Sequence, residues 1–170
     1  MSQDENPIRY FDNRLQKEAV KLLPGQYYAT ASDKALVTIL GSCVAACIFD
    51  QEKKIGGMNH FMLPDLNFTT NLDACLATKY GVHAMNMLID QLVHLGARRN
   101  KLMAKAFGGG KVLPGFVQQD IGRVNAEFVL EYLDDANIPL ISSDLMSTYA
   151  RKIYYFPADG NVYMKRIREF

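Results

Sequence analysis

The sequence has 170 residues, enough for one domain that buries a hydrophobic core without disulfides or metals. Its hydrophobic content of 49% and charged content of 22% exclude a disordered chain, since both are ordinary for a globular protein. The formal net charge of +1 excludes a molecule-wide field that would favour nucleic acid or an anionic membrane surface.

The beginning of the chain shows no targeting signal. The first residues, MSQDENPIRY, are acidic and lack the apolar stretch of a secretory signal. The longest uncharged run, residues 35–49, is shorter than the roughly 20 residues that a membrane helix needs. We therefore expect a cytoplasmic protein without membrane insertion, whose three cysteines stay reduced. Residues 1–25 are predicted to be a flexible segment, and residues 26–170 a single domain.

Two helices are predicted between runs of strands. Turn signals bound β-type segments at 27–31, 35–40, 44–50 and 54–63, and again at 101–107, 139–145, 150–158 and 162–170. A helix that ends at Gly96 is predicted from an apolar stripe, formed by Ala77, Gly81, Ala84, Leu88, Leu92 and Leu95. A second helix begins near Asp120 and ends at Asn137 and Pro139. These elements predict an α+β fold, a largely antiparallel β-sheet packed with two main helices.

The segment LGSCVAACIFDQEKKIGGMNHFMLP, residues 40–64, reads as a β-hairpin that holds Cys43 and His60. A two-residue turn would place these side chains directly opposite each other on antiparallel strands. A four-residue turn, 51–54, would keep them diagonal on one face, whereas an odd turn would separate the faces. Two of the three turn lengths therefore bring a thiol and an imidazole together.

This pairing suits acyl transfer, because an imidazole can take the proton of a thiol and later protonate a leaving amine. Gly41 permits an unusual backbone turn before the cysteine, and the N–H groups of Ser42 and Cys43 would stabilise an oxyanion. A buried structural thiol is the alternative. A metal site at Cys43, Cys47 and His60 would need a helix, because the two cysteines lie roughly 13 Å apart on a strand.

A glycine run, residues 108–110, precedes Lys111 and is similar to a phosphate-binding loop. The spacing of the glycines and the residue after the lysine do not fit that motif. We therefore predict a flexible loop at the end of a strand, which lines a site without binding a nucleotide.

The stretches GSCVAACIFD and GGMNHFMLP together resemble the signature of the CheD family, the chemoreceptor glutamine deamidases of bacterial chemotaxis. The segments AKAFGGG, IGRVNAEFVLEYL, ISSDL and ARKIYYFPADGNVYMKR follow in the order expected of that family. The resemblance covers roughly residues 26–168 and implies a CheD-like fold. It also implies a protein-glutamine glutaminase, which hydrolyses glutamine side-chain amides in the cytoplasmic helices of chemoreceptors to glutamate and ammonia.

The catalytic cysteine and histidine of the family fall on Cys43 and His60. Its third catalytic position, a threonine six residues before the cysteine, falls on Val37, with Thr38 one place later. Either the backbone carbonyl of Val37 or, after a shift of register, the hydroxyl of Thr38 would orient the imidazole. A second departure lies in SDLMSTYAR, where the family tends to carry an Asp-x-Gly-Gly stretch before the arginine.

The resemblance further implies methyl-accepting chemoreceptors as protein substrates and a CheC-type phosphatase as a partner, with no cofactor and no metal. Two other functions stay open at this point. One is a non-catalytic chemotaxis adaptor that binds receptor or phosphatase through a decayed site. The other is a generic thiol hydrolase, such as a peptidase, which acts on an unrelated amide.

Overall fold

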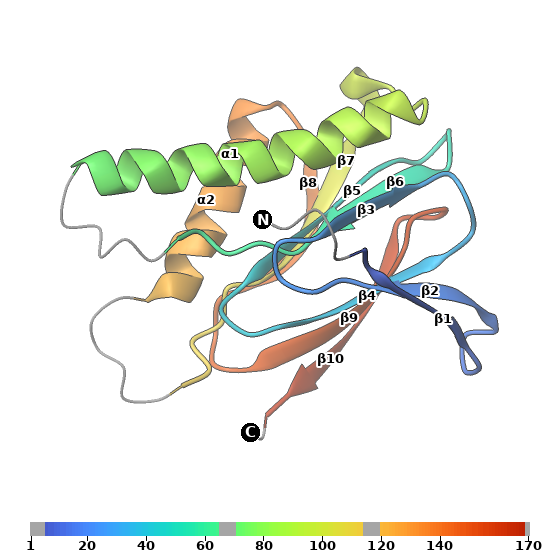
Figure 1. The fold of residues 1–170 in the computed structure, drawn as a ribbon, viewed down its shortest axis with the longest axis horizontal. Helices are drawn as coiled ribbons and strands as arrows, with labels where there is room; N and C mark the ends of the chain where they lie inside the picture. Colours follow the sequence, from blue (N-terminus) through green and yellow to red (C-terminus); the bar gives the residue numbers. More distant parts are fainter. Residues whose placement is uncertain (1–5, 65–70, 114–119, 169–170) are drawn as a thin grey trace.

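The computed structural model describes residues 6–64, 71–113 and 120–168, which contain ten strands, two α-helices and one short 3-10 helix, Arg99–Lys101. The strands form two five-stranded sheets, and both α-helices lie on the same side of the molecule (Figure 1). The prediction of an α+β fold is thereby confirmed. None of the described helices is long and apolar enough to cross a membrane.

The first sheet has the strand order β1-β2-β4-β9-β10 and the second the order β3-β6-β5-β7-β8. The strands of the first sheet are β1 (Ile8–Asp12), β2 (Lys17–Lys21), β4 (Ala35–Leu40), β9 (Ala150–Phe156) and β10 (Asn161–Ile167). Those of the second are β3 (Tyr27–Thr30), β6 (Ile55–Asn59), β5 (Val44–Asp50), β7 (Met103–Gly108) and β8 (Leu140–Leu145). The pairs β2/β4 and β7/β8 are parallel and the other named pairs antiparallel, so both sheets are mixed but largely antiparallel.

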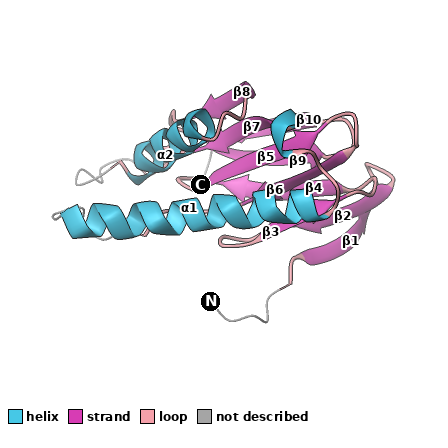
Figure 2. Ribbon diagram, turned by 90° about the horizontal axis from the view of Figure 1, so that it is seen from above, coloured by secondary structure: helices cyan, strands magenta, loops and turns pink. Residues whose placement is uncertain are grey.

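Three layers result, because the helices cover one face of the second sheet and the first sheet covers its other face (Figure 2). Strand β5 is buried at every position, which explains its continuous apolar sequence. Its residues 44, 46 and 48 pack toward the helices, and its residues 45, 47 and 49 pack toward the first sheet. The strand therefore carries the centre of both cores.

The two helices follow their predicted signals. Helix α1 (Asn71–His94) packs on β6 and β3, and Gly96 just beyond it has φ +111°, the left-handed conformation predicted from the sequence. Helix α2 (Ile121–Asp135) packs on β5 and β7. The Asp120 side chain accepts a hydrogen bond from the Arg123 N–H and so caps α2, and Asn137 adopts φ 56° after its end.

The N-terminal region differs from the sequence prediction of a flexible segment over residues 1–25. The structure places β1 and β2 there, and Ala19, Val20 and Leu22 are almost fully buried. Strand β2 pairs in parallel with β4, whose partner positions include Val37. These two short strands show only a weak alternating pattern, and they become ordered because β2 pairs with a strand that follows later in the chain.

Candidate active site

The β5–β6 hairpin has the four-residue turn that was one of the predicted alternatives. Asp50 pairs with Ile55 across it, and the same register places Val44 opposite Phe61. Cys43 immediately precedes Val44, and His60 immediately precedes Phe61. In antiparallel strands this offset places Cys43 and His60 diagonally on one face of the hairpin. This face turns toward the first sheet, and Cys43 packs there against the core between the sheets.

Thr38 of β4 meets His60 from the first sheet. The Thr38 hydroxyl lies 2.7 Å from His60 Nδ1 and 2.7 Å from the Leu22 carbonyl oxygen. The carbonyl only accepts hydrogen bonds, so the single hydroxyl proton of Thr38 goes to Leu22. Nδ1 must then carry a proton and donate it to Thr38. This chain of two hydrogen bonds fixes the tautomer of His60 and leaves a lone pair on Nε2.

The Nε2 atom of His60 is buried and has no hydrogen-bond partner within the described part of the chain. His60 is only 3% exposed, and this burial lowers its pKa from 6.5 to about 4. A buried polar atom without a partner costs stability, and such atoms concentrate at functional sites. His60 is therefore a neutral base at physiological pH, oriented at Nδ1 and free at Nε2.

The structure brings Thr38, and not Val37, to the imidazole. The Val37 side chain packs with Ala19 and Ala35 on the outer face of the first sheet, away from His60. Its carbonyl accepts a hydrogen bond from the Leu22 N–H, and the group that contacts the imidazole Nδ1 is the Thr38 hydroxyl. Thr38 needs no shift of register, because alternate residues of β4 point between the two sheets.

The loop residues Gly41 and Ser42, which precede Cys43, are held in place by hydrogen bonds to their backbone carbonyl groups. Gly110 N–H donates to the Gly41 carbonyl at 2.9 Å, and the Asn125 side-chain amide donates to the Ser42 carbonyl at 2.9 Å. In a trans peptide the N–H points opposite to the preceding carbonyl. The N–H groups of Ser42 and Cys43 therefore point away from Gly110 and Asn125. This direction is compatible with the predicted role of these two N–H groups as oxyanion donors.

Asn125 of α2 is a site residue that the sequence reasoning missed. Its amide is fully buried, and its Oδ1 accepts a hydrogen bond from the Leu63 N–H at 2.9 Å. One side chain thus ties the residue before Cys43 to a residue three positions after His60. The signal available in the sequence was an asparagine among apolar residues on the buried face of a predicted helix.

The glycine run 108–110 is a buried brace rather than the flexible loop predicted from the sequence. Gly109 N–H donates to the Cys43 carbonyl at 2.8 Å. Gly108 has φ +110°, and a Cβ there would lie 2.2 Å from the Cys43 carbonyl oxygen. Only glycine allows this close approach of β7 to the loop that carries Cys43. The run therefore positions Cys43 by backbone contacts.

The segment SDLMSTYAR packs against this brace. Met146 N–H donates to the Gly108 carbonyl, and Lys111 N–H donates to the Ser147 carbonyl, both at 2.8 Å. Met146 and Ser147 each have φ 70°, the left-handed region that glycine adopts without strain. Glycine at these two positions, as in the Asp-x-Gly-Gly stretch that the resemblance implies, would adopt both angles without strain. This chain adopts them with methionine and serine.

Replacing Ser147 with glycine is expected to stabilise the protein. A left-handed non-glycine residue destabilises the folded state by about 1–2 kcal/mol, and glycine removes this strain. Glycine also loses more backbone entropy on folding, which offsets about 0.5–1 kcal/mol of the stabilisation. We expect the free energy of unfolding in urea to rise by about 0.5 kcal/mol or more. Thr148→Gly is the matched control, because Thr148 has no positive φ, and it should destabilise the protein. A loss of stability in Ser147→Gly would contradict the argument from strain.

The three cysteines differ in their surroundings. Cys43 is half-buried, Cys47 is buried and Cys75 is exposed. Burial raises the pKa of the Cys43 thiol, an effect that its own backbone N–H opposes. Burial raises the pKa of Cys47 further, which fits a structural thiol. Within the described ranges, no three His, Cys, Asp or Glu side chains are grouped to hold a metal ion.

The fold and the site define an α+β protein in which a threonine contacts an oriented histidine between two sheets, with a half-buried cysteine on the same face of the hairpin. Residues 62–166 match the family model CheD, described as CheD chemotactic sensory transduction. That match begins two residues after His60, so neither Cys43 nor His60 lies within it.

Alignments with similar proteins extend over nearly the whole chain and cover the candidate site as well. The chain is 51% identical over 162 residues to the probable chemoreceptor glutamine deamidase CheD 1 of Shewanella oneidensis, covering 95% of this chain and 79% of the relative. It is 50% identical over 159 residues to the protein of the same name in Dechloromonas aromatica, covering 94% of this chain and 78% of the relative. The probable chemoreceptor glutamine deamidase CheD of Methylobacillus flagellatus is 50% identical over 161 residues, with 94% and 79% covered. This chain belongs to the CheD family.

Proposed function

We propose that this protein is a chemoreceptor glutamine deamidase that uses Cys43 as its nucleophile and His60 as its general base and acid. The observation that carries this proposal is the contact of Thr38 with His60 Nδ1, which leaves a buried and unpartnered Nε2 on the face that His60 shares with Cys43. Family membership supports the reaction, since similar proteins bear the name of that activity.

In the first half of the reaction, Cys43 Sγ attacks the side-chain carbonyl carbon of a glutamine, and His60 Nε2 takes the thiol proton. Both groups start neutral, because burial raises the pKa of Cys43 and lowers that of His60. The thiol proton therefore moves from Cys43 to His60 as the carbon–sulfur bond forms, and no thiolate–imidazolium ion pair exists beforehand. The N–H groups of Ser42 and Cys43 stabilise the oxyanion on the amide oxygen.

The tetrahedral intermediate then collapses as the carbon–nitrogen bond breaks. His60 Nε2 returns the proton to the departing nitrogen, and ammonia leaves a glutamyl thioester on Cys43. Water attacks this thioester and gives a proton to Nε2. The carbon–sulfur bond breaks, the thiol regains its proton, and glutamate is released. Thr38 stays uncharged throughout and holds the ring by accepting from Nδ1.

Two other functions predict different results with a soluble cytoplasmic fragment of a chemoreceptor. A deamidase releases ammonia and leaves the polypeptide intact, whereas a peptidase produces new chain ends. A non-catalytic adaptor binds the fragment and releases nothing. We expect ammonia release without cleavage; the contact of Thr38 with His60 argues against a decayed site. A CheC-type phosphatase as a partner remains a prediction.

The acid limb of the deamidation rate is expected near pH 4. The reaction needs neutral His60 in the free enzyme, and burial lowers its pKa to about 4. Measuring kcat/KM by ammonia release between pH 4 and 8 should therefore show activity persisting below pH 6. A limb between pH 6 and 7 would contradict this assignment of the base.

The same shift affects folding, so circular dichroism at each pH is the control. Because the folded state disfavours the protonated imidazole, its contribution to stability is complete above pH 6.5 and declines as the pH falls toward 4. The loss amounts to about 3 kcal/mol over that window. Rates are compared only where the far-ultraviolet spectrum is unchanged.

A further inference from the structure

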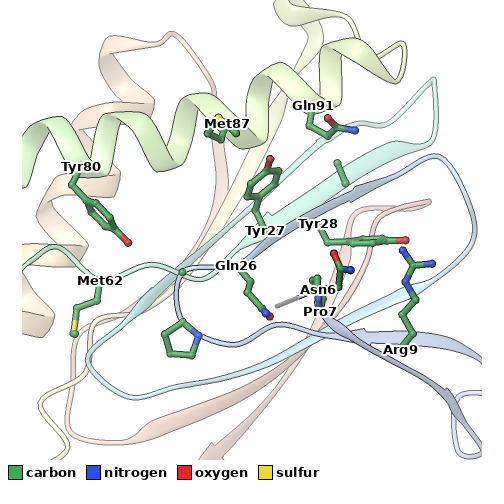
Figure 3. Close-up of a pocket in the computed structure, with 13 residues that line it drawn as sticks. Asn6, Pro7, Arg9, Gln26, Tyr27, Tyr28, Met62, Tyr80, Met87 and Gln91 are labelled. Atoms are coloured by element: carbon green, nitrogen blue, oxygen red, sulfur yellow. The ribbon is translucent and has the colours of Figure 1, made fainter. Parts of the chain in front are cut away.

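A groove of about 910 Å³ lies beside the candidate active site, between α1, β3 and the chain that precedes β1. Tyr80, Met87 and Gln91 reach into it from α1, and Tyr27 comes from β3 on the opposite wall (Figure 3). The lining also includes Arg9, Gly25, Gln26, Tyr28 and Met62. Tyrosine and methionine give the groove the amphipathic, adaptable surface that suits protein segments.

This groove is continuous with the catalytic hairpin. Its wall residues Gly25 and Gln26 hydrogen-bond both backbone groups of His60: Gly25 N–H donates to the His60 carbonyl at 2.7 Å, and His60 N–H donates to the Gln26 carbonyl at 3.0 Å. Met62 lines the groove and lies 4.0 Å, sulfur to oxygen, from the Ser42 hydroxyl. A segment that lies in the groove would therefore end beside Cys43.

Arg9 supplies positive charge at the far end of the groove. Its guanidinium lies 5.5 Å from the centre of the Tyr28 ring. Lys34 Nζ lies 5.6 Å from the same ring and donates to its hydroxyl, but Glu18 offsets its charge with a carboxylate oxygen at 3.5 Å. Arg9 is the one ionised side chain among the described residues of the lining, which include no Asp or Glu. An acidic side chain would be attracted to this end, and a basic one repelled.

We propose that this groove binds the segment of the chemoreceptor substrate that flanks the target glutamine, as an amphipathic helix with an acidic side chain directed at Arg9. The proposal rests on the proposed function and adds a docking surface to it. Apolar side chains of the helix contact Tyr27, Tyr80 and Met87, and the glutamine reaches Cys43 past Met62. Docking at a distance from the reacting amide selects which glutamines are converted.

Charge-introducing variants on both sides of the groove test the proposal. Arg9→Glu reverses the charge at the end of the groove that would receive the acidic side chain of the substrate. Met87→Glu places a carboxylate on the apolar wall formed by α1. Each has a matched control outside the lining: Arg14→Glu in the β1–β2 turn for Arg9, and Val93→Glu on α1 for Met87, both exposed. Unfolding midpoints of all four variants show whether the fold is kept.

Binding is measured by fluorescence anisotropy with a labelled chemoreceptor cytoplasmic fragment and Cys43→Ala protein, so that no turnover occurs. We expect Arg9→Glu and Met87→Glu to raise Kd about tenfold or more, and the two controls to leave it within about twofold. Raising the salt concentration should weaken the effect of Arg9→Glu more than that of Met87→Glu. Unchanged Kd in both groove variants would overturn the proposal.

The same variants with Cys43 intact separate this proposal from the proposed function. Deamidation whose KM is unaffected by Arg9→Glu and Met87→Glu would overturn the groove while the deamidase activity stands. Groove-dependent binding without ammonia release from the wild-type protein would overturn the deamidase activity while the groove stands as a docking surface.

Discussion

Replacing Cys43 with alanine is expected to abolish deamidation of a chemoreceptor fragment, because the reaction then has no atom to form the thioester. Cys43→Ser is expected to be nearly as inactive, since a serine hydroxyl is a much weaker acid than a thiol and His60, with a pKa of about 4, is a weak base. The remaining site should stay intact, because Cys43 is only half-buried and its backbone contacts with Gly109 do not depend on its side chain. Ammonia release measures the rate.

The other two cysteines supply the controls. Cys75→Ala removes an exposed thiol and should leave the rate unchanged. Cys47→Ala removes a fully buried thiol from the core between the sheets and should lower the unfolding temperature while activity is retained at low temperature. Deamidation that survives Cys43→Ala would rule out Cys43 as the nucleophile. Deamidation that also disappears in folded Cys75→Ala would show that the loss is not specific to Cys43.

Replacing Thr38 with valine is expected to reduce kcat about a hundredfold, because the imidazole loses the group that fixes its ring. Valine has the same shape but leaves the Leu22 carbonyl and His60 Nδ1 without the hydroxyl, at a stability cost of about 1–3 kcal/mol. Thr38→Ser keeps the hydroxyl and should restore most of kcat. A group that acts on orientation alone should change kcat much more than KM.

Thr30 offers a matched control for this substitution. It is a buried threonine on β3 whose hydroxyl accepts a hydrogen bond from the Ser32 N–H, and none of the side-chain hydrogen bonds of the described residues joins it to His60. Thr30→Val should cost stability and leave kcat close to the wild-type value. Equal losses of kcat in Thr30→Val and Thr38→Val would show that general destabilisation, and not the orientation of His60, explains the effect.

Much of the fold could be predicted from local patterns. The apolar stripe of α1, its end at Gly96 and the cap of α2 at Asp120 are all in the structure where the sequence placed them. These features depend on neighbours a few residues apart, which a single sequence displays. The two N-terminal strands were missed, because β2 is ordered by pairing with β4 and by burial of Ala19 and Val20.

In the candidate site, the placement of Cys43 and His60 could be predicted from the sequence, but the contacts that support them could not. The separation of Cys43 from His60 is a local property of one hairpin, and its four-residue turn was among the alternatives derived from the sequence. The contacts of Thr38 and Asn125 join elements far apart in the chain, and no spacing rule connects them to His60 or Ser42. The positive φ of Ser147 was likewise invisible, because serine is an uncommon residue in that conformation.

The most direct test of the proposed deamidation is site-resolved mass spectrometry of a chemoreceptor cytoplasmic fragment incubated with the wild-type protein in ¹⁸O-labelled water. Hydrolysis of a glutamyl thioester by solvent water places one labelled oxygen in each new carboxyl group. We predict that particular glutamines become glutamates carrying that single label, with the polypeptide uncleaved. Glutamines that remain unchanged after incubation with folded protein would contradict the proposed function.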